Sequence, residues 1–261
     1  MGDLTGRVAV VTGAGSGIGK AAAVLLAQQG VRVAVLDHGR EQAQQTAEEI
    51  TQAGYEAMTL VADITNEEQM QQATQQISER WGRLDIVFAN AGINGVWAPL
   101  EELTLEEWTR TLTINLTGTF VTIKAALPYL KKQGTGSIIV TSSVNGTRIF
   151  SNSGASAYSA SKAGQVALVK MVAVELAPAN IRVNVICPGA TETSISDDTE
   201  QRDVEQVKFP VEYPKGSIPL SGKRAQPEQI AEVVLFLASD ASTYVTGTEV
   251  WIDAALSLVV G

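Results

Sequence analysis

Tyr158 and Lys162 are four residues apart in the stretch Tyr158-Ser159-Ala160-Ser161-Lys162, in a segment with a helical pattern. Residues at this spacing share one face of a helix, so the Lys162 ammonium is expected near the Tyr158 phenol. A nearby positive charge stabilises a phenolate and lowers the phenol pKa from about 10, which suits proton transfer to and from a substrate oxygen. Taken alone the pattern is weak, because many surface helices contain it by chance.

A glycine-rich turn follows the first apolar run of the chain and leads into a predicted helix. Its glycines fit Gly-x-x-x-Gly-x-Gly at Gly13, Gly17 and Gly19. Such a turn lets backbone N–H groups approach a pyrophosphate at a helix N-terminus. The Walker A pattern fails because Ala21 stands where Ser or Thr is needed, and this disfavours nucleotide hydrolysis. The spacing G-x-G-x-x-G also fails, which leaves a dinucleotide cradle of a different spacing or a turn without a ligand.

Asp37 ends the second predicted strand, about 20 residues beyond the glycine turn. A carboxylate there can accept hydrogen bonds from both hydroxyls of an adenosine ribose and would repel a 2′-phosphate, so NAD is favoured over NADP. Arg40 weakens this preference, because an Arg nearby can accept a 2′-phosphate. Asp63, after the third strand, could reach the adenine amino group. Both acidic residues could instead simply end their strands, and His38 is expected to pack beside the adenine.

The elements that must position these groups alternate along the chain. Nearly continuous apolar runs, typical of strands buried on both faces, alternate with helix-length segments. The predicted strands are Arg7–Thr12, Val31–Leu36, Ala57–Val61, Leu84–Ala89, Ser137–Ser142, Ile181–Cys187 and Thr248–Ile252. The predicted helices are 17–29, 41–53, 66–80, 105–132, 157–178 and 227–239, and Asn66 is expected to cap the third.

This alternation predicts an α/β fold: a doubly wound, seven-stranded parallel Rossmann-type sheet with helices on both faces. One segment, about 191–223, has no convincing strand and contains three prolines (Pro210, Pro214 and Pro219). Because a helix and a strand resume after it, we interpret it as a substrate-side lid within one domain that spans residues 1–261.

Composition excludes several other functions. The 261 residues carry 19 Lys+Arg and 28 Asp+Glu, a net charge of −9, which argues against nucleic acid or an anionic membrane as a partner. The single cysteine, Cys187, excludes an intramolecular disulfide and a cysteine-based zinc site, and one His offers no metal site. No apolar run approaches the ~20 residues of a membrane span. We therefore expect a cytoplasmic protein without a metal.

Further motifs make the pattern specific: Asn90-Ala91-Gly92 after the fourth strand, Asn115, Ser142-Ser143, and Pro188-Gly189. With the glycine turn and Tyr158-x-x-x-Lys162, they resemble the classical short-chain dehydrogenases/reductases along nearly the whole chain, from Gly13 to Asp253. The resemblance implies hydride transfer between a nicotinamide cofactor and a secondary alcohol or ketone, the protein supplying orientation and proton handling.

The resemblance also implies catalytic roles. Tyr158 matches the general acid/base, and Ser143 matches the hydroxyl that hydrogen-bonds the substrate oxygen. Lys162 matches the residue that binds the nicotinamide ribose and lowers the tyrosine pKa, and Asn115 resembles the asparagine that holds a water in the proton relay to Lys162. Alternatives are that Ser142 supplies the hydroxyl and that Asn115 only caps or kinks its helix.

The implied cofactor contacts come from the segments that follow the strands. Asn90 resembles a residue that supports the adenine-ribose side, and the loop from Pro188 to Thr193 matches one that holds the nicotinamide carboxamide. The full expected set is Gly13, Ser16, Gly17, Ile18, Gly19, Asp37, Asp63, Asn90, Ala91, Gly92, Tyr158, Lys162, Pro188, Gly189, Thr191 and Thr193. Cys187, just before Pro188, is interpreted as a packing residue.

The substrate side is less defined. Ser143, Asn145, Phe150, Asn152 and Tyr158 are the candidate substrate-binding residues, with Asn94 and Trp97 as further candidates. This mixture suits a modest polar substrate, but a 3-oxoacyl thioester or a steroid also fits. Tyr158 follows Ser143 by 15 residues, more than is usual in the family, which predicts a small insertion in 147–157 at the pocket mouth.

Two functional classes remain open. The first is an NAD(H)-dependent dehydrogenase or ketoreductase, with 3-oxoacyl thioester reduction as an alternative within the family. The second is a cofactor-binding regulator without turnover, which would gain nothing from the intact residues Asn115, Ser143, Tyr158 and Lys162. The resemblance implies a homotetramer formed by the two long helices and the C-terminal strand. Ala254-Ala255 departs from the family's usual Gly-Gly and puts the local turn in doubt.

Overall fold

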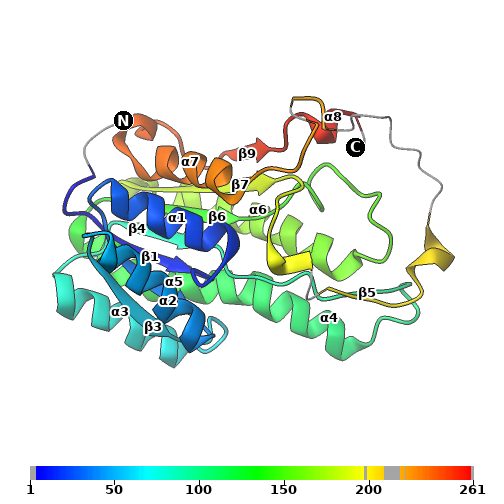
Figure 1. The fold of residues 1–261 in the computed structure, drawn as a ribbon, viewed down its shortest axis with the longest axis horizontal. Helices are drawn as coiled ribbons and strands as arrows, with labels where there is room; N and C mark the ends of the chain where they lie inside the picture. Colours follow the sequence, from blue (N-terminus) through cyan, green and yellow to red (C-terminus); the bar gives the residue numbers. More distant parts are fainter. Residues whose placement is uncertain (1–3, 197–198, 209–217, 221, 260–261) are drawn as a thin grey trace.

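The computed structural model describes residues 4–196, 199–208, 218–220 and 222–259. A central sheet of seven parallel strands runs through it (Figure 1). Its strands are β1 (Val8–Thr12), β2 (Arg32–Asp37), β3 (Ala57–Val61), β4 (Ile86–Ala89), β6 (Gly136–Thr141), β7 (Ile181–Pro188) and β9 (Glu249–Ile252). The predicted fold class is confirmed, and each predicted strand is present to within two residues at either end.

The strands lie in the order β3-β2-β1-β4-β6-β7-β9. From β1 the chain proceeds outward through β2 to β3, then crosses back to place β4 on the other side of β1. The order therefore reverses between β1 and β4. In open α/β sheets, ligands bind beyond the carboxyl ends of the strands at such a switch point. The loops that follow β1 and β4 are the glycine turn and Asn90-Ala91-Gly92.

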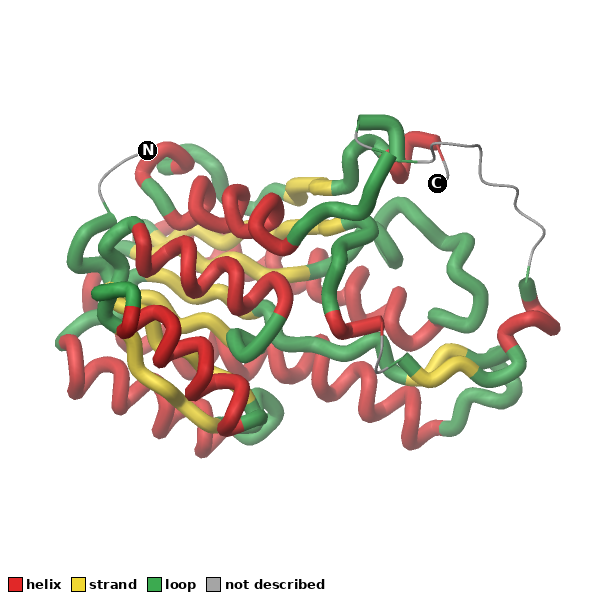
Figure 2. The backbone as a smooth tube through the Cα atoms, viewed as in Figure 1, coloured by secondary structure: helices red, strands yellow, loops and turns green. Residues whose placement is uncertain are grey.

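Two helical layers cover the sheet (Figure 2). On one face α1 (Gly17–Gln28), α2 (Arg40–Gln52) and α7 (Pro227–Ala238) bury small and branched apolar side chains against alternate strand residues. On the other face α3 (Glu67–Trp81), α5 (Gly118–Gln133) and α6 (Ser156–Leu176) do the same. Burial on both faces explains why the strand sequences are almost continuously apolar. The predicted cap is confirmed, since the Asn66 side chain accepts a hydrogen bond from Gln69 N.

The predicted long helix over 105–132 is divided into three parts. It consists of α4 (Leu105–Leu112), a π-helical turn over Thr113–Thr117, and α5. Gly118, at the start of α5, lies where a Cβ would be 2.5 Å from Ile64 Cδ1, so α5 approaches the loop after β3 closely. The apolar periodicity of the sequence does not predict this π turn, because the one residue that it inserts into the helix barely shifts the apolar pattern.

The segment predicted to be irregular contains more structure than expected. A short 3₁₀ turn (Ser194–Ser196), β8 (Glu200–Gln201) and a second 3₁₀ turn (Val204–Val207) follow β7. β8 pairs in parallel with β5 (Val96–Trp97), far away in sequence. The expectation of no strand is wrong here, because two paired residues leave no periodic signal. Pro219 is among the described residues, whereas Pro210 and Pro214 lie outside them.

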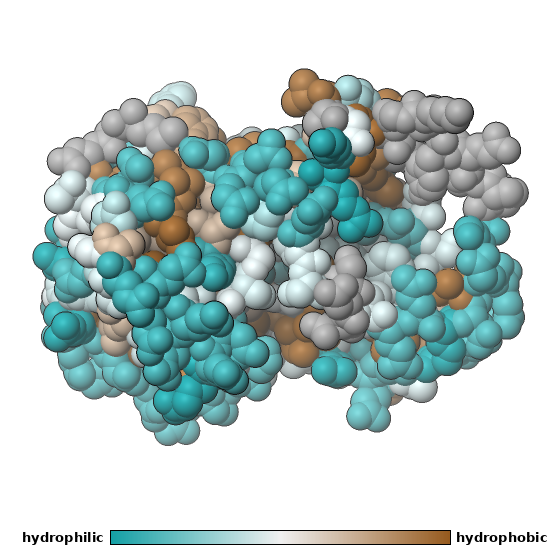
Figure 3. Space-filling model, viewed as in Figure 1, coloured by the Kyte–Doolittle hydropathy of each residue, from teal (hydrophilic) through white to brown (hydrophobic). Residues whose placement is uncertain are grey.

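The surface is mostly polar over α2 and α3 (Figure 3). Both helices are rich in exposed Gln and Glu, as their sequences predict for solvated faces. Within the described ranges, none of the helices combines the length and hydropathy required to cross a membrane.

The turn after β9 keeps the backbone shape of a glycine pair without the glycines. Ala254 and Ala255 have φ of 50° and 66°, in the left-handed region. The Asp253 carboxylate holds the turn by accepting hydrogen bonds from Ala255 N (3.1 Å) and Ser257 N (2.9 Å). A Cβ in this region costs about 1–2 kcal/mol per residue, so the turn is strained by its sequence.

We therefore predict that Ala255→Gly stabilises the protein. Removing the Cβ relieves the strain of the left-handed backbone, whereas glycine also gives the unfolded chain more conformational freedom, which opposes folding. The free energy of unfolding should therefore rise by about 1 kcal/mol, and Tm by roughly 2–4 °C. Differential scanning calorimetry measures this. Ala53→Gly is the matched control, because Ala53 has φ of −77° and its substitution should not raise Tm. An unchanged or lower Tm for Ala255→Gly would show that the turn carries no such strain.

Candidate active site

The predicted catalytic side chains meet at the carboxyl end of β6. Ser143 lies just beyond β6, and α6 contributes Tyr158 and Lys162, all three of them buried. The Ser143 hydroxyl lies beside the Tyr158 phenol and influences its pKa. Lys162 Nζ donates to Thr141 O (2.9 Å) and lies 5.6 Å from the centroid of the Tyr158 ring. The structure thus brings together the hydroxyl, phenol and ammonium predicted from sequence.

Ser142 and Ser143 have different surroundings. Ser142 Oγ donates to the backbone carbonyl of Lys162 (2.8 Å), which ties the end of β6 to α6. Ser143 Oγ accepts from Asn145 N (3.1 Å) and faces the Tyr158 phenol. The geometry therefore favours Ser143 as the reactive hydroxyl and gives Ser142 a structural contact.

Burial dominates the electrostatics of the site. It raises the pKa of Tyr158, and the hydrogen bond from Ser143 opposes the rise. It also lowers the pKa of Lys162 to about 8. The expectation of a lowered Tyr158 pKa is wrong for this geometry, because desolvation of the phenol is the largest contribution to the pKa. The phenol is therefore protonated at neutral pH, the form that donates a proton.

Asn115 lies within the π turn and neither caps nor ends a helix. Its Oδ1 accepts from Ile93 N (2.8 Å), and its Nδ2 donates to Ile93 O (2.9 Å) and Ser161 Oγ (3.0 Å). These bonds join the loop after β4 to α6. The Asn115 carbonyl accepts from Thr119 Oγ1 (2.7 Å) and from Gln165 Nε2 (2.8 Å). Sequence reasoning missed Gln165, whose helical spacing of three from Lys162 was the available signal.

The glycine turn is closely packed, and its helix N-terminus is open. Gly13 has φ of 63°, and a Cβ on it would be 2.9 Å from Ala91 Cα. A Cβ on Gly19 would collide with the Gly13 carbonyl, so this position accepts no side chain. Ser16 makes no side-chain cap, and the first turn of α1 contains no acidic residue. The N–H groups near Ser16, Gly17 and Ile18 are therefore arranged for an anion, which fits a dinucleotide pyrophosphate.

Asp37 lies beside this turn. Its carboxylate accepts from Gly15 N (2.9 Å) and Gly39 N (3.0 Å), and His38 Nδ1 is 3.0 Å from Asp37 Oδ1. The carboxylate is thus fixed where the second strand meets the glycine turn, as the ribose hypothesis requires. The His38 side chain is 91% exposed and contacts this carboxylate.

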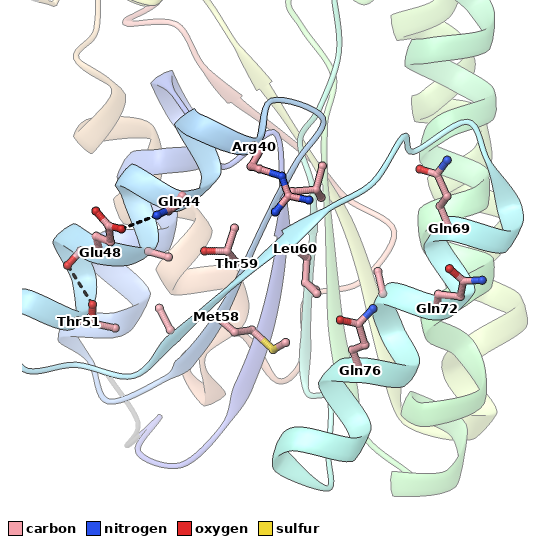
Figure 4. A pocket seen from close by; sticks show the side chains of 14 residues that line it. Arg40, Gln44, Glu48, Thr51, Met58, Thr59, Leu60, Gln69, Gln72 and Gln76 are labelled. Carbon is pink, nitrogen blue, oxygen red and sulfur yellow. Dashed lines mark hydrogen bonds between the residues drawn. The ribbon is translucent and has the colours of Figure 1, made fainter.

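Arg40 extends over β3, within a surface cavity of about 620 Å³ between α2 and α3 (Figure 4). The cavity is also lined by Leu60 and Val61 of β3 and by Gln69 of α3. The Arg40 side chain makes none of the hydrogen bonds that hold the Asp37 carboxylate.

Asn90 links the loop after β4 to two other strands. Its N–H donates to Thr12 Oγ1 (3.0 Å), its Nδ2 to Thr12 O (3.2 Å), and its Oδ1 accepts from Thr141 Oγ1 (3.0 Å). Ala91 N also donates to Thr12 Oγ1 (3.1 Å). Asn90 and Ala91 therefore hold the switch point together.

Two other predicted cofactor residues flank the switch point. Gly92 lies where a Cβ would be 3.0 Å from Asn115 Oδ1 and 3.5 Å from Lys162 Nζ. Asp63 is exposed, and its Oδ1 accepts from Thr65 N and Thr65 Oγ1 (both 2.8 Å). Gly92 therefore gives the loop a close approach to the catalytic groups, and Asp63 holds its own turn.

The loop after β7 packs against the glycine turn. A Cβ on Gly17 would be 3.1 Å from Thr193 Cγ2, and one on Gly189 would be 2.7 Å from Asp253 Cβ. Pro188 O accepts from Val144 N (3.0 Å), which places this loop beside Ser143. Thr191 Oγ1 donates to Gly189 O (3.2 Å). The loop therefore lies between the phosphate cradle and the catalytic hydroxyl, where a nicotinamide ring would have to be held.

The candidate substrate residues separate into different groups. Asn152 Nδ2 donates to Asn145 Oδ1 (2.6 Å) within the 147–157 loop region, whereas Phe150 is 73% exposed. The Trp97 ring centroid is 6.5 Å from that of Tyr158. Asn94 is used structurally, since its Nδ2 donates to Thr199 Oγ1 (2.7 Å) and Ile195 O (3.3 Å).

Cys187 is buried, and burial raises the pKa of its thiol to about 11. A protonated thiol at this position packs and does not act as a nucleophile, in agreement with the sequence interpretation.

A proton-donating triad and a phosphate cradle at one edge of a doubly wound sheet are the marks of a nucleotide-dependent oxidoreductase. Residues 13–257 match the family model described as enoyl-(acyl carrier protein) reductase. The chain belongs to the short-chain dehydrogenase/reductase family, and it is an oxidoreductase that acts on CH–OH groups.

Two curated relatives share 38% identity with the chain. One is the 3-oxoacyl-[acyl-carrier-protein] reductase FabG of Thermotoga maritima, aligned over 97% of this chain and 98% of the relative. The other is a cyclohexanol dehydrogenase of an Acinetobacter species, aligned over 95% and 94%.

Two solved structures have the same fold. A 3-ketoacyl-ACP reductase from Sinorhizobium meliloti 1021 superposes with a TM-score of 0.94 at 49% identity, covering 97% of this chain and 99% of that one. A 3-ketoacyl-(acyl-carrier-protein) reductase from Brucella melitensis, solved with NADH, gives a TM-score of 0.86 at 30% identity over 97% and 99%.

We predict that Ser143→Ala lowers kcat by about 10²-fold, because it removes a hydrogen bond to the developing oxygen charge. Ser142→Ala is the matched control and should lower Tm while leaving kcat within about threefold, since its bond is to backbone. Steady-state kinetics with thermal melts measure both. The reverse pattern, with Ser142→Ala the more damaging to kcat, would assign the reactive hydroxyl to Ser142.

Proposed function

We propose that this protein is an NAD(H)-dependent dehydrogenase/reductase that interconverts a secondary alcohol and a ketone. The observation that carries the proposal is the buried Ser143–Tyr158–Lys162 arrangement beside an open helix N-terminus. The cofactor supplies the hydride that reduces the carbonyl carbon. What remains for the protein is to orient the substrate and to move one proton.

In the direction of ketone reduction, the Tyr158 O–H donates its proton to the carbonyl oxygen. Ser143 donates a hydrogen bond to the same oxygen and stabilises the charge that develops there. The raised pKa of Tyr158 suits this direction, because the phenol is protonated at neutral pH. In alcohol oxidation Tyr158 acts as a phenolate, the form that the nearby Lys162 ammonium stabilises, and it becomes a neutral phenol by accepting the proton of the substrate hydroxyl.

The cofactor would be held along the carboxyl edge of the sheet. Backbone N–H groups around Ser16, Gly17 and Ile18 would bind the pyrophosphate, and Asp37 would accept from the adenosine ribose. Lys162 would bind the ribose that carries the nicotinamide, and the Pro188–Thr193 loop would hold the nicotinamide carboxamide. Asn90, with Ala91 and Gly92, would support the adenine-ribose side. Asp63 would contact the adenine.

We expect NADH to bind at least about tenfold more tightly than NADPH, because the Asp37 carboxylate repels a 2′-phosphate. Titration by nucleotide fluorescence measures the ratio. Asp37→Ser should reduce it by removing the repulsion, while Arg40→Ala should leave it unchanged, since Arg40 lies over β3. Tighter binding of NADPH to the unsubstituted protein would reverse the assignment, and a loss of NADPH binding in Arg40→Ala would identify the cause.

The substrate is proposed as a small secondary alcohol or its ketone. The names of the relatives favour two classes, a cyclic alcohol and a 3-oxoacyl thioester. The aromatic wall of Trp97 beside Tyr158 fits a compact apolar ring, and the Asn145–Asn152 pair adds polar groups nearby. We rank the cyclic alcohol first and keep the thioester as the second candidate.

A panel that contains cyclohexanol, polyols, hydroxy acids, their ketones and a 3-oxoacyl thioester, followed by nicotinamide absorbance, tests the proposal. For the best substrate, Tyr158→Phe should lower kcat by about 10³-fold while leaving NADH affinity within about twofold, because the phenol supplies the proton. Turnover unchanged by Tyr158→Phe would overturn the mechanism. Tight NADH binding without turnover of any panel member would favour a cofactor-binding regulator.

We also propose a homotetramer in the cytoplasm, by analogy with the family. Apolar side chains that lie exposed on α4, α5 and α6 support contact between copies: Leu105, Phe120, Met171 and Val174. Light scattering should give four times the 27.6 kDa of one chain. A monomeric mass would contradict the assembly.

A further inference from the structure

Residues 199–208, here called the strap, lie along the substrate side of the fold. The strap begins beside Asn94, which donates to Thr199 Oγ1 (2.7 Å). It continues through β8, which pairs with β5, and Val204 Cγ1 lies 2.9 Å from the position of a Cβ on Gly154. Figure 1 shows β5 at the opposite end of the molecule from α3, beyond the carboxyl ends of the strands. The strap therefore touches two segments that flank the catalytic groups.

One cation, Arg202, joins the strap to α4. Its guanidinium donates to Glu107 Oε1 (2.9 Å) and Oε2 (3.0 Å) and to the Glu102 carbonyl (2.7 Å). Its backbone N–H donates to Trp97 O (2.9 Å). The carboxylates of Glu200 and Glu102 lie farther away, at 3.9 and 4.0 Å. A bidentate guanidinium–carboxylate bond of this kind fixes both the orientation of Arg202 and its distance from Glu107.

Glu107 is held independently of Arg202. It occupies the third position of α4 and forms a capping box with Thr104, in which each side chain bonds the other's backbone N–H. The bonds from Arg202 and then from Thr104 lower the pKa of Glu107 to about 2. A lowered pKa means that the pair is intact above the usual carboxyl range and is lost only as pH falls toward 2. Arg202 is thus anchored to a rigid helix start at every working pH.

The strap meets the site through Trp97. The Trp97 backbone pairs with the strap at Gln201 and Arg202, and its ring stands beside the ring of Tyr158. Trp97 Nε1 donates to Asn94 O (3.2 Å). The indole ring of Trp97 is therefore held by Asn94, a residue of the same short segment whose backbone pairs with the strap. A shift of the strap would therefore move one wall of the space in front of the phenol.

We propose that Arg202 is a positioning residue for the substrate: through its bonds to Glu107, Glu102 and Trp97 it holds the strap and the Trp97 wall against the substrate side of Tyr158. The proposal rests on the proposed function, because it assigns the space beside Tyr158 to the substrate. It predicts that the strap determines substrate affinity and leaves the proton-transfer groups and the cofactor cradle unchanged.

The test measures KM, kcat and NADH affinity of Arg202→Met, with hydrogen exchange of residues 94–97 and 199–208. Loss of the charge-assisted bonds should raise substrate KM by about tenfold, leave kcat and NADH affinity within about twofold, and speed exchange in both segments. Arg202→Lys should recover only part of the effect, since an ammonium cannot reproduce the fork.

Two variants of α4 separate the strap contact from helix stability. Glu107→Gln keeps a side chain able to complete the capping box but loses the charge, so KM should rise, and adding it to Arg202→Met should cause little further change. Thr104→Ala weakens the cap while leaving Arg202 and Glu107 paired, so Tm should fall with KM unchanged.

An unchanged KM in Arg202→Met despite faster exchange would overturn the proposal, as would equal losses of KM, kcat and NADH affinity. A KM increase in Thr104→Ala equal to that in Glu107→Gln would also overturn it, because helix stability would then explain the effect. Failure of the proposed function gives a different result: Tyr158→Phe would keep its turnover, whatever the strap does.

Discussion

The side chain of Asn90 joins the carboxyl ends of three neighbouring strands, and the site depends on that junction. On β1, Asn90 Nδ2 donates to Thr12 O and the Asn90 backbone N–H donates to Thr12 Oγ1. Asn90 itself directly follows β4, and its Oδ1 accepts from Thr141 Oγ1 on β6. The carbonyl of Thr141 in turn accepts from Lys162 Nζ. One short network thus runs from the glycine turn to the Lys162 ammonium and fixes the glycine turn relative to the candidate active site.

Burial gives this edge of the sheet its chemical character. The phenol of Tyr158 and the ammonium of Lys162 are both held in surroundings that disfavour charge, so the pKa of the phenol rises and the pKa of the ammonium falls to about 8. Burial thus favours the neutral phenol as the form of Tyr158 at neutral pH, the form that can donate a proton. The acidic net charge of the chain is therefore compatible with a site that is locally apolar and positively charged.

Much of the fold could be predicted because it is written in local patterns. The β-branched runs and the helix-length segments between them predict the sheet. The spacing of Tyr158, Lys162 and the glycines identifies these residues as candidates for the site. The family resemblance already favours Ser143 over Ser142, and the structure adds a physical reason, because Ser143 lies beside the phenol whereas Ser142 bonds a backbone carbonyl. Sequence spacing also suggested a lowered phenol pKa, since it carries no information on desolvation.

What sequence could not supply are contacts between distant segments that leave no periodic trace. Pairing of β5 with β8 involves two residues on each side, and Arg202 reaches Glu107 across 95 positions. Gln165 donates to the Asn115 carbonyl, which lies within the π turn that interrupts the helix. Such features are visible only when the neighbouring elements are in place.

Placing Tyr158 and Lys162 on a single helix has a consequence for how such a protein can diversify. Their separation is set within α6 and by the end of β6, neither of which includes the segments that wall the substrate space. Insertions or exchanges in those outer segments can alter which molecule is admitted without disturbing the pair that handles the proton. In this architecture, substrate selectivity can therefore change independently of the proton-transfer chemistry, through changes in the outer segments alone.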